Sequence, residues 1–128
     1  MRLGSVERRL SRRRIHPAGR PPSAHEEAIE RFLLSLDLPD ASRAYVEHHL
    51  PRMVRTLALV PPPRGNGRAL ELGAYMHMTP ALARVLGYRD VRGAYLGPLG
   101  SSDERIASVE GREIFRCAID LFDVEEAA

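Results

Sequence analysis

The residues best suited to chemistry lie in a short segment near the middle of the chain. Glu71 belongs to an apolar run, 68–73, which ends in Gly73 and is typical of a buried parallel strand. A glycine at the end of such a strand lets a ligand approach the backbone closely, because it carries no side chain. The carboxylate of Glu71 suits a ligand ammonium or hydroxyl group. Together these residues predict a site for a small charged ligand.

The residues that follow predict the elements that complete this site. Thr79 and Pro80 form a strong helix start, with threonine as N-cap and proline at the first helical position. Residues 90–95 read as a second strand, so that 68–95 fits a right-handed crossover between parallel strands. Ligands bind beyond the carboxyl ends of such strands, which makes 73–78 the expected binding loop. The helix N-terminus would add N–H groups for a carboxylate or phosphate.

A second carboxylate is expected at the same edge of the sheet. Residues 112–119 read as a third strand, and Asp120 follows them directly. Acids at the ends of the first and third strands, Glu71 and Asp120, would therefore point toward one crevice. Spacing alone supports a ligand site and an ordinary pair of loop-facing acids equally well.

The central motifs resemble those of a known enzyme superfamily. Residues 69–73 (ALELG) are similar to the first motif of class I S-adenosylmethionine-dependent methyltransferases, in which a strand ends as hydrophobic, acid, hydrophobic, glycine. Residues 75–82 (YMHMTPAL), 91–98 (VRGAYLGP) and 115–123 (FRCAIDLFD) resemble a bacterial branch of that superfamily. The resemblance covers residues 41–128, the front of the catalytic domain.

The resemblance implies a fold, a cofactor and a function. The fold would be α/β: a partial Rossmann-like three-layer sandwich with three parallel strands in the order 3-2-1, preceded by N-terminal helices and truncated before strand four. The chain would be the N-terminal cofactor-binding portion of a methyltransferase that uses S-adenosylmethionine, and would be inactive alone. The alternative interpretation is a degenerate, non-catalytic βαβ module for binding or assembly.

In this resemblance the first strand and its loop hold the methionine end of the cofactor. Glu71 would reach the ammonium group, directly or through water, and Gly73, Ala74 and Tyr75 would form the loop beneath the methionine moiety. The superfamily usually continues as G-x-G-x-G, whereas Tyr75 and His77 stand at the later glycine positions, where side chains would narrow the approach. No catalytic base is assigned: His77 would shape the loop, and proton transfer by its imidazole is the less favoured interpretation.

The second and third strands would hold the nucleoside end of the cofactor. Tyr95 and Leu96 stand where the second strand usually delivers a ribose-binding acid, so the bidentate grip on the ribose hydroxyls is missing. Asp120 would lie beside the adenine amino group. The acceptor substrate is not readable, because specificity would lie mostly in the part of the domain that follows the third strand.

Three segments are predicted along the chain. Residues 1–22 hold seven of the 19 basic residues, all of them arginine, and are expected to form a flexible Arg-rich tail. Residues 23–60 predict two helices, the first begun by a capping box of Ser23 and Glu26. Residues 66–128 would be the incomplete methyltransferase cofactor-binding half.

Composition and charge exclude several classes of protein and partner. A single cysteine excludes an internal disulfide. No apolar run approaches the roughly 20 residues of a membrane-spanning helix, and no secretory signal is apparent, so we expect a cytoplasmic protein without a membrane partner. The chain beyond residue 20 has a net charge of −4 and no nucleic-acid-binding motif, which disfavours nucleic acid as a partner.

The missing fourth strand has a physical consequence. The first strand would become an edge of the sheet with unpaired N–H and C=O groups. We therefore expect the chain to be marginally stable alone or to self-associate through this edge, and a truncated reading frame is the other interpretation.

Overall fold

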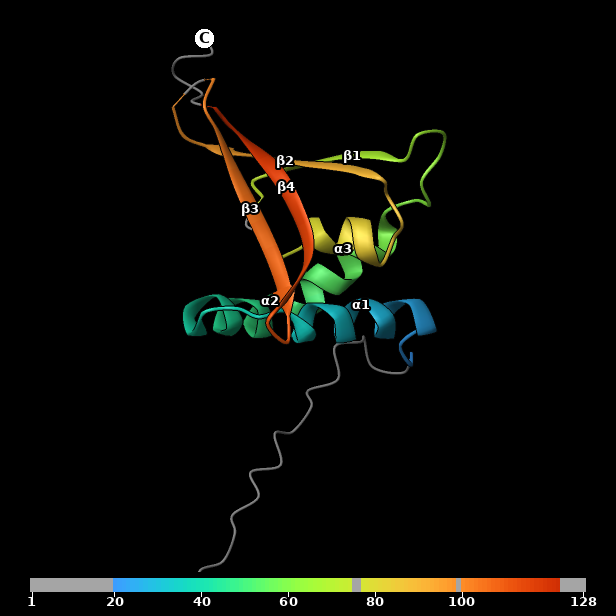
Figure 1. Ribbon diagram of the computed structural model, residues 1–128. Coiled ribbons are helices and arrows are strands. Elements are labelled where there is room, and N and C mark those ends of the chain that lie inside the picture. The colour runs from blue at the N-terminus through green and yellow to red at the C-terminus, as the bar shows by residue number, and fades with distance from the viewer. Residues whose placement is uncertain (1–19, 75–76, 99, 123–128) are drawn as a thin grey trace, which may run out of the picture.

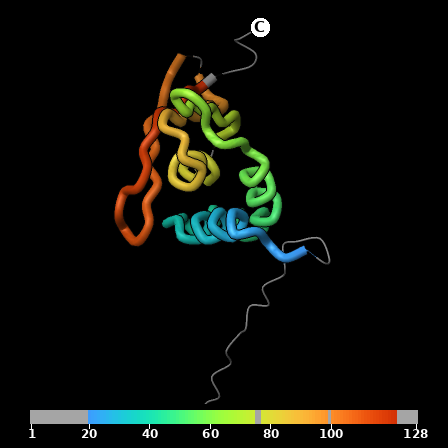
Figure 2. Tube along the Cα trace, turned by 90° about the vertical axis from the view of Figure 1, so that its right-hand side faces the viewer, coloured from blue at the N-terminus to red at the C-terminus, as the bar shows by residue number. Residues whose placement is uncertain are grey.

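The computed structural model describes residues 20–74, 77–98 and 100–122, which form a mixed α/β fold (Figure 1). The strands make one open sheet, and Figures 1 and 2 show the helices gathered on one side of it. The described chain therefore has two layers, where three were predicted. In chain order the elements are α1 (Ala24–Ser35), α2 (Asp40–Leu59), β1 (Arg68–Leu72), α3 (Thr79–Arg84), β2 (Asp90–Leu96), β3 (Ser102–Val109) and β4 (Arg112–Phe122).

The sheet differs from the prediction by one antiparallel strand. Its order is β1-β2-β4-β3. β1 pairs with β2, and β2 with β4, in parallel. β3 pairs with β4 in antiparallel fashion, in a segment where no strand was predicted. The α/β class is confirmed, but a sheet of three parallel strands alone is not what the chain forms.

β3 and β4 are joined by a two-residue turn. Glu110 has φ 51° and Gly111 has φ 75°, so both adopt the left-handed conformation of the tight turns that suit hairpins. A Glu-Gly pair is a weaker turn signal than Asn-Gly or Asp-Gly. This is why the sequence pattern did not predict the hairpin.

A local cap fixes the start of α1, and the three helices share an apolar core. The hydroxyl of Ser23 accepts a hydrogen bond from the N–H of Glu26 at 3.1 Å, which confirms the predicted cap of α1. None of the described helices combines the length and apolar character needed to cross a membrane. The main buried cluster joins the three helices to β2: Ile29, Leu33, Val46, Leu50, Met53, Val54, Leu57, Ala81, Leu82 and Val91.

The link between α1 and α2 is bonded to the tip of the hairpin. The carboxylate of Asp37 accepts hydrogen bonds from the N–H groups of Glu110 at 3.1 Å and Gly111 at 2.8 Å. The N–H of Asp37 donates to the carbonyl of Ser108 at 2.8 Å. These bonds join segments 73 residues apart and hold the β3 edge of the sheet against the helical layer.

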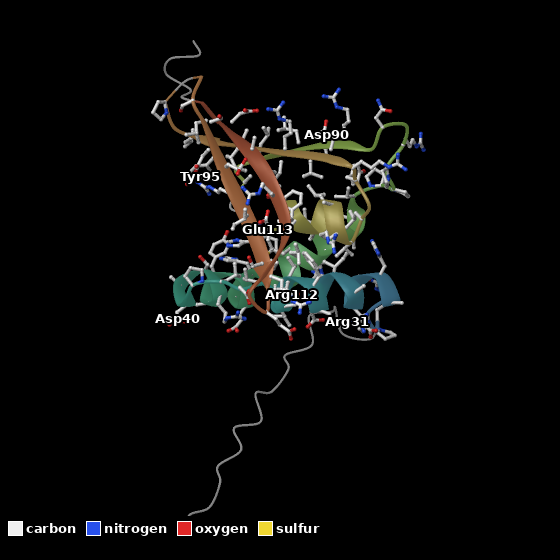
Figure 3. The ribbon with its side chains drawn as sticks, in the orientation of Figure 1. Arg31, Asp40, Asp90, Tyr95, Arg112 and Glu113 are labelled. Atoms are coloured by element: carbon white, nitrogen blue, oxygen red, sulfur yellow. The ribbon has the colours of Figure 1, made fainter. Side chains whose placement is uncertain are left out.

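We predict that Asp37→Ala lowers the free energy of unfolding by about 1–2 kcal/mol, because two N–H groups of the turn lose a charged acceptor. Urea denaturation measures the change. Asp40→Ala is the matched control: Asp40, labelled in Figure 3, begins α2 without a capping side chain, and its loss removes only a few tenths of a kcal/mol of helix-dipole stabilisation. Equal effects of the two substitutions would contradict the role given to Asp37.

Candidate functional site

The turn at the carboxyl end of β1 is built around Gly73. Gly73 has φ +73°, a left-handed conformation that favours glycine. The N–H groups of Gly73 and Ala74 both donate to the carbonyl of Ala94, at 2.8 and 3.0 Å. A Cβ added to Gly73 would meet none of the other described residues within 4 Å. The backbone conformation therefore favours glycine, while the described residues leave the space beside the turn open.

The turn rests on a tightly packed floor. Ala74 is fully buried. A Cβ added to Gly93, on β2, would lie 2.6 Å from Cβ of Ala74 and 2.4 Å from Cδ1 of Ile119 on β4. Real side chains do not approach so closely, so only glycine fits at position 93. The three parallel-paired strands thus meet in a rigid floor below an open turn.

Glu71 is held by the start of α3. It is half-buried, and its Oε2 accepts a hydrogen bond from Oγ1 of Thr79, which is fully buried. Burial raises the pKa of Glu71 more than the bond from Thr79 lowers it. The N-cap of α3 is Met78 and makes no side-chain capping bond, so the predicted capping role of Thr79 is wrong. Its hydroxyl orients Glu71 instead.

The residues expected near the ribose point to opposite faces of β2. Tyr95, labelled in Figure 3, is half-buried, and Cζ of Arg105 lies 5.8 Å from its ring centroid. Leu96 is 62% exposed. Successive residues of a strand alternate between faces, so Tyr95 faces the helices and Leu96 faces solvent. Tyr75, the remaining loop residue of the prediction, lies outside the described residues.

The two acids do not share a crevice. β4 extends beyond Asp120, which therefore lies inside the strand and not after it. Glu71 is in register with Gly93, whereas Asp120 is in register with the next residue, Ala94. The two carboxylates consequently lie on opposite faces of the sheet. Asp120 forms an exposed ion pair with Arg92 at 3.4 Å, and the prediction that Glu71 and Asp120 face one crevice is wrong.

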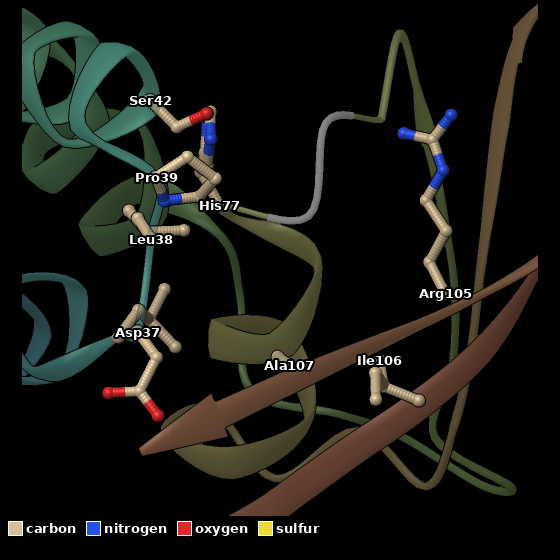
Figure 4. Close-up of a pocket in the computed structure, with 9 residues that line it drawn as sticks. Asp37, Leu38, Pro39, Ser42, His77, Arg105, Ile106 and Ala107 are labelled. Carbon is tan, nitrogen blue, oxygen red and sulfur yellow. The ribbon is translucent and has the colours of Figure 1, made fainter. Parts of the chain in front are cut away.

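A cavity lies beside the loop that follows β1. It has a volume of about 290 Å³ and is lined by residues of the α1–α2 link, the loop and β3 (Figure 4): Leu36, Asp37, Leu38, Pro39, Ser42, His77, Arg105, Ile106 and Ala107. His77 is 8% exposed, and burial lowers its pKa, so its imidazole is neutral at neutral pH. The sequence prediction missed Arg105 because it missed β3.

Neither relatives nor a metal cluster identifies the site. Comparison with known protein families, curated proteins and solved structures gives no match. Within the described ranges, no three His, Cys, Asp or Glu side chains are grouped so that they could hold a metal ion.

We predict that Glu71→Gln raises the free energy of unfolding at neutral pH. Because the folded-state pKa of Glu71 is raised, the protonated side chain stabilises the folded state. Its contribution to the free energy of unfolding is complete below the ordinary glutamate pKa and is lost as the pH rises through the folded-state pKa. The variant avoids this loss, so its advantage should shrink as the pH falls to about pH 4.

Urea denaturation at several pH values measures this difference. Glu47→Gln, on the exposed side of α2, controls for the loss of one negative charge. An advantage of Glu71→Gln that persisted unchanged at acid pH would contradict the burial of an ionised carboxylate at this position.

Proposed function

We propose that residues 66–128 are the cofactor-binding portion of a class I S-adenosylmethionine-dependent methyltransferase. The observation that carries the proposal is the parallel β1–α3–β2 crossover, in which β1 ends at a glycine with positive φ. The order of the parallel-paired strands, β1-β2-β4, supports a Rossmann-like arrangement to which β3 adds an antiparallel edge. In such sheets small ligands bind beyond the carboxyl ends of the strands.

The chemistry of Glu71 supports the same proposal. Its Oε2 is bonded to Thr79, while its Oε1 has no hydrogen-bond partner within the described part of the chain. A half-buried carboxylate with a raised pKa is stabilised when a cation binds beside it. The ammonium group at the methionine end of the cofactor is such a cation, and Thr79 would keep the carboxylate oriented toward it.

The turn supplies the space that the cofactor needs. The open side of Gly73 leaves room for the methionine moiety, and the floor of Ala74, Gly93 and Ile119 keeps the turn in place. The described residues offer nothing comparable for the nucleoside end, because Tyr95 has no carboxylate for the ribose and Asp120, expected beside the adenine, lies on the other face. When bound, the cofactor supplies a sulfonium methyl group for attack by an acceptor. The residues of this chain would bind and orient it, and weak binding is expected.

We predict that S-adenosylmethionine and S-adenosylhomocysteine bind the chain in calorimetric titration, and that Gly73→Asn weakens binding by about tenfold or more, a change of roughly 1.4 kcal/mol. Asparagine tolerates positive φ, so the variant keeps the turn while filling the open space. Gly65→Asn is the matched control, since Gly65 also has positive φ and open surroundings but lies before β1. No binding to the wild type at millimolar ligand, or equal weakening by both substitutions, would overturn the proposal.

The free edge of β1 favours one alternative, a non-catalytic module that assembles with other chains. Within the described residues β1 has a neighbouring strand on one side only. The backbone N–H and C=O groups of successive strand residues point to opposite edges of the strand. Because the N–H of Gly73 points toward β2, those of Leu70 and Leu72 point to the free edge. Their side chains are 61% and 73% exposed. Such an edge can pair with another strand.

A groove of about 390 Å³ runs along this edge beneath the exposed leucines. Apart from Arg68 and Glu71 its lining is apolar or aromatic: Leu57, Val60, Ala69, Leu70, Leu72, Met78, Leu82 and Tyr88. A strand added to β1 would cover part of this groove.

The alternative predicts that the chain self-associates, as measured by sedimentation velocity. Leu72→Lys should abolish the association, because a charge on the free edge opposes strand addition. Leu96→Lys is the control: Leu96 is exposed on the same face but belongs to β2, which is paired on both sides. A wild-type chain that stays monomeric at its highest attainable concentration would exclude the assembly module.

A further inference from the structure

The cavity between the α1–α2 link and β3 has the chemical character of a site for a small acid. Its volume of about 290 Å³ is close to the lower limit, roughly 300 Å³, of pockets that hold small molecules. Most of the side chains along the link are apolar. Figure 4 shows Arg105 on one side of the cavity, and His77 and Ser42 on the other. The cavity thus combines an apolar wall with a cation.

The guanidinium of Arg105 is held in place, but some of its hydrogen-bond donors have no acceptor among the described residues. Its side chain is 34% exposed, and its Nε donates to Oδ2 of Asp103 at 3.2 Å. Its Cζ lies 5.8 Å from the ring centroid of Tyr95, within the range of a cation–π contact. Its two terminal nitrogens find no acceptor within the described ranges. A guanidinium held in this way can bind a carboxylate with two parallel hydrogen bonds.

The charges around the cavity favour a singly charged ligand. Asp103 offsets part of the charge of Arg105, and Asp37 adds a carboxylate whose oxygens already accept two backbone N–H groups of the hairpin turn. His77 is neutral at neutral pH. One guanidinium thus faces two carboxylates, so a dianion such as phosphate would be repelled more strongly than a monoanion. The half-buried hydroxyl of Ser42 can bond a polar group at the far end of the ligand.

We infer that this cavity binds a small, mostly apolar monocarboxylic acid. The carboxylate binds the terminal nitrogens of Arg105, and the apolar body lies against Leu38 and Pro39. Binding needs no cofactor. Because His77 belongs to the loop between β1 and α3, the same cavity would hold the acceptor substrate, a role that rests on the proposed function.

The test is titration of the full chain with benzoate, with binding measured by calorimetry or by ligand-detected NMR. Benzoate should bind in roughly the millimolar range expected for a ligand of its size, and Arg105→Gln should weaken it by about tenfold or more. Arg92→Gln is the matched control, because Arg92 is also a strand arginine with one carboxylate partner. Benzamide, which lacks the charge, should bind more weakly than benzoate.

A second pair of variants tests the cavity independently of charge. Ser42→Leu should fill it and weaken benzoate, whereas Ala41→Leu, on the exposed neighbouring residue, should not. The inference is overturned if benzoate does not bind, if Arg105→Gln and Arg92→Gln bind it equally, or if inorganic phosphate binds more tightly. Failure of S-adenosylmethionine to bind while benzoate binds through Arg105 would remove the proposed function and leave this site standing.

Discussion

The carbonyl of Ala94 is the group on which the site depends most. It accepts the N–H groups of both Gly73 and Ala74, and so fixes the point at which β1 leaves the sheet. That geometry is possible because Gly93, just before it, lets Ala74 and Ile119 pack across β2 without a side chain between them. A rigid floor and an open turn follow from these contacts. The position of Glu71, two residues before Gly73, follows from them as well.

Two regions suited to ligands lie on either side of one loop. At its start, Glu71 has a raised pKa and an oxygen that no described residue bonds, a state that a bound cation relieves. Near its end, His77 lines the cavity that Arg105 closes from β3. Reactions that bring a cationic donor to an acidic acceptor need two such regions close together. This adjacency gives the proposed function and the inferred acid site a common structural basis.

Local signals were readable from the sequence, and long-range ones were not. The cap at Ser23 and the strand ending in Gly73 depend on neighbours within a few residues, and the structure confirms the α/β class they indicated. The hairpin was missed because its turn residues signal weakly. Asp120 was misplaced because the strand continues three residues past its predicted end at residue 119, and side chains inside a strand alternate between the two faces. The bonds from Asp37 and Thr79 join elements that no local pattern relates.

Amide hydrogen exchange tests most directly whether β1 is fixed by β2 alone. The amides of Gly73 and Ala74 donate to Ala94, and we expect them to be protected. The amides of Leu70 and Leu72 face the free edge of the sheet, and we expect them to exchange at rates close to those of an unstructured chain. If the amides of Leu70 and Leu72 were as protected as that of Gly73 in a monomeric sample, another segment would cover this edge. That result would contradict a β1 strand that is fixed by β2 alone.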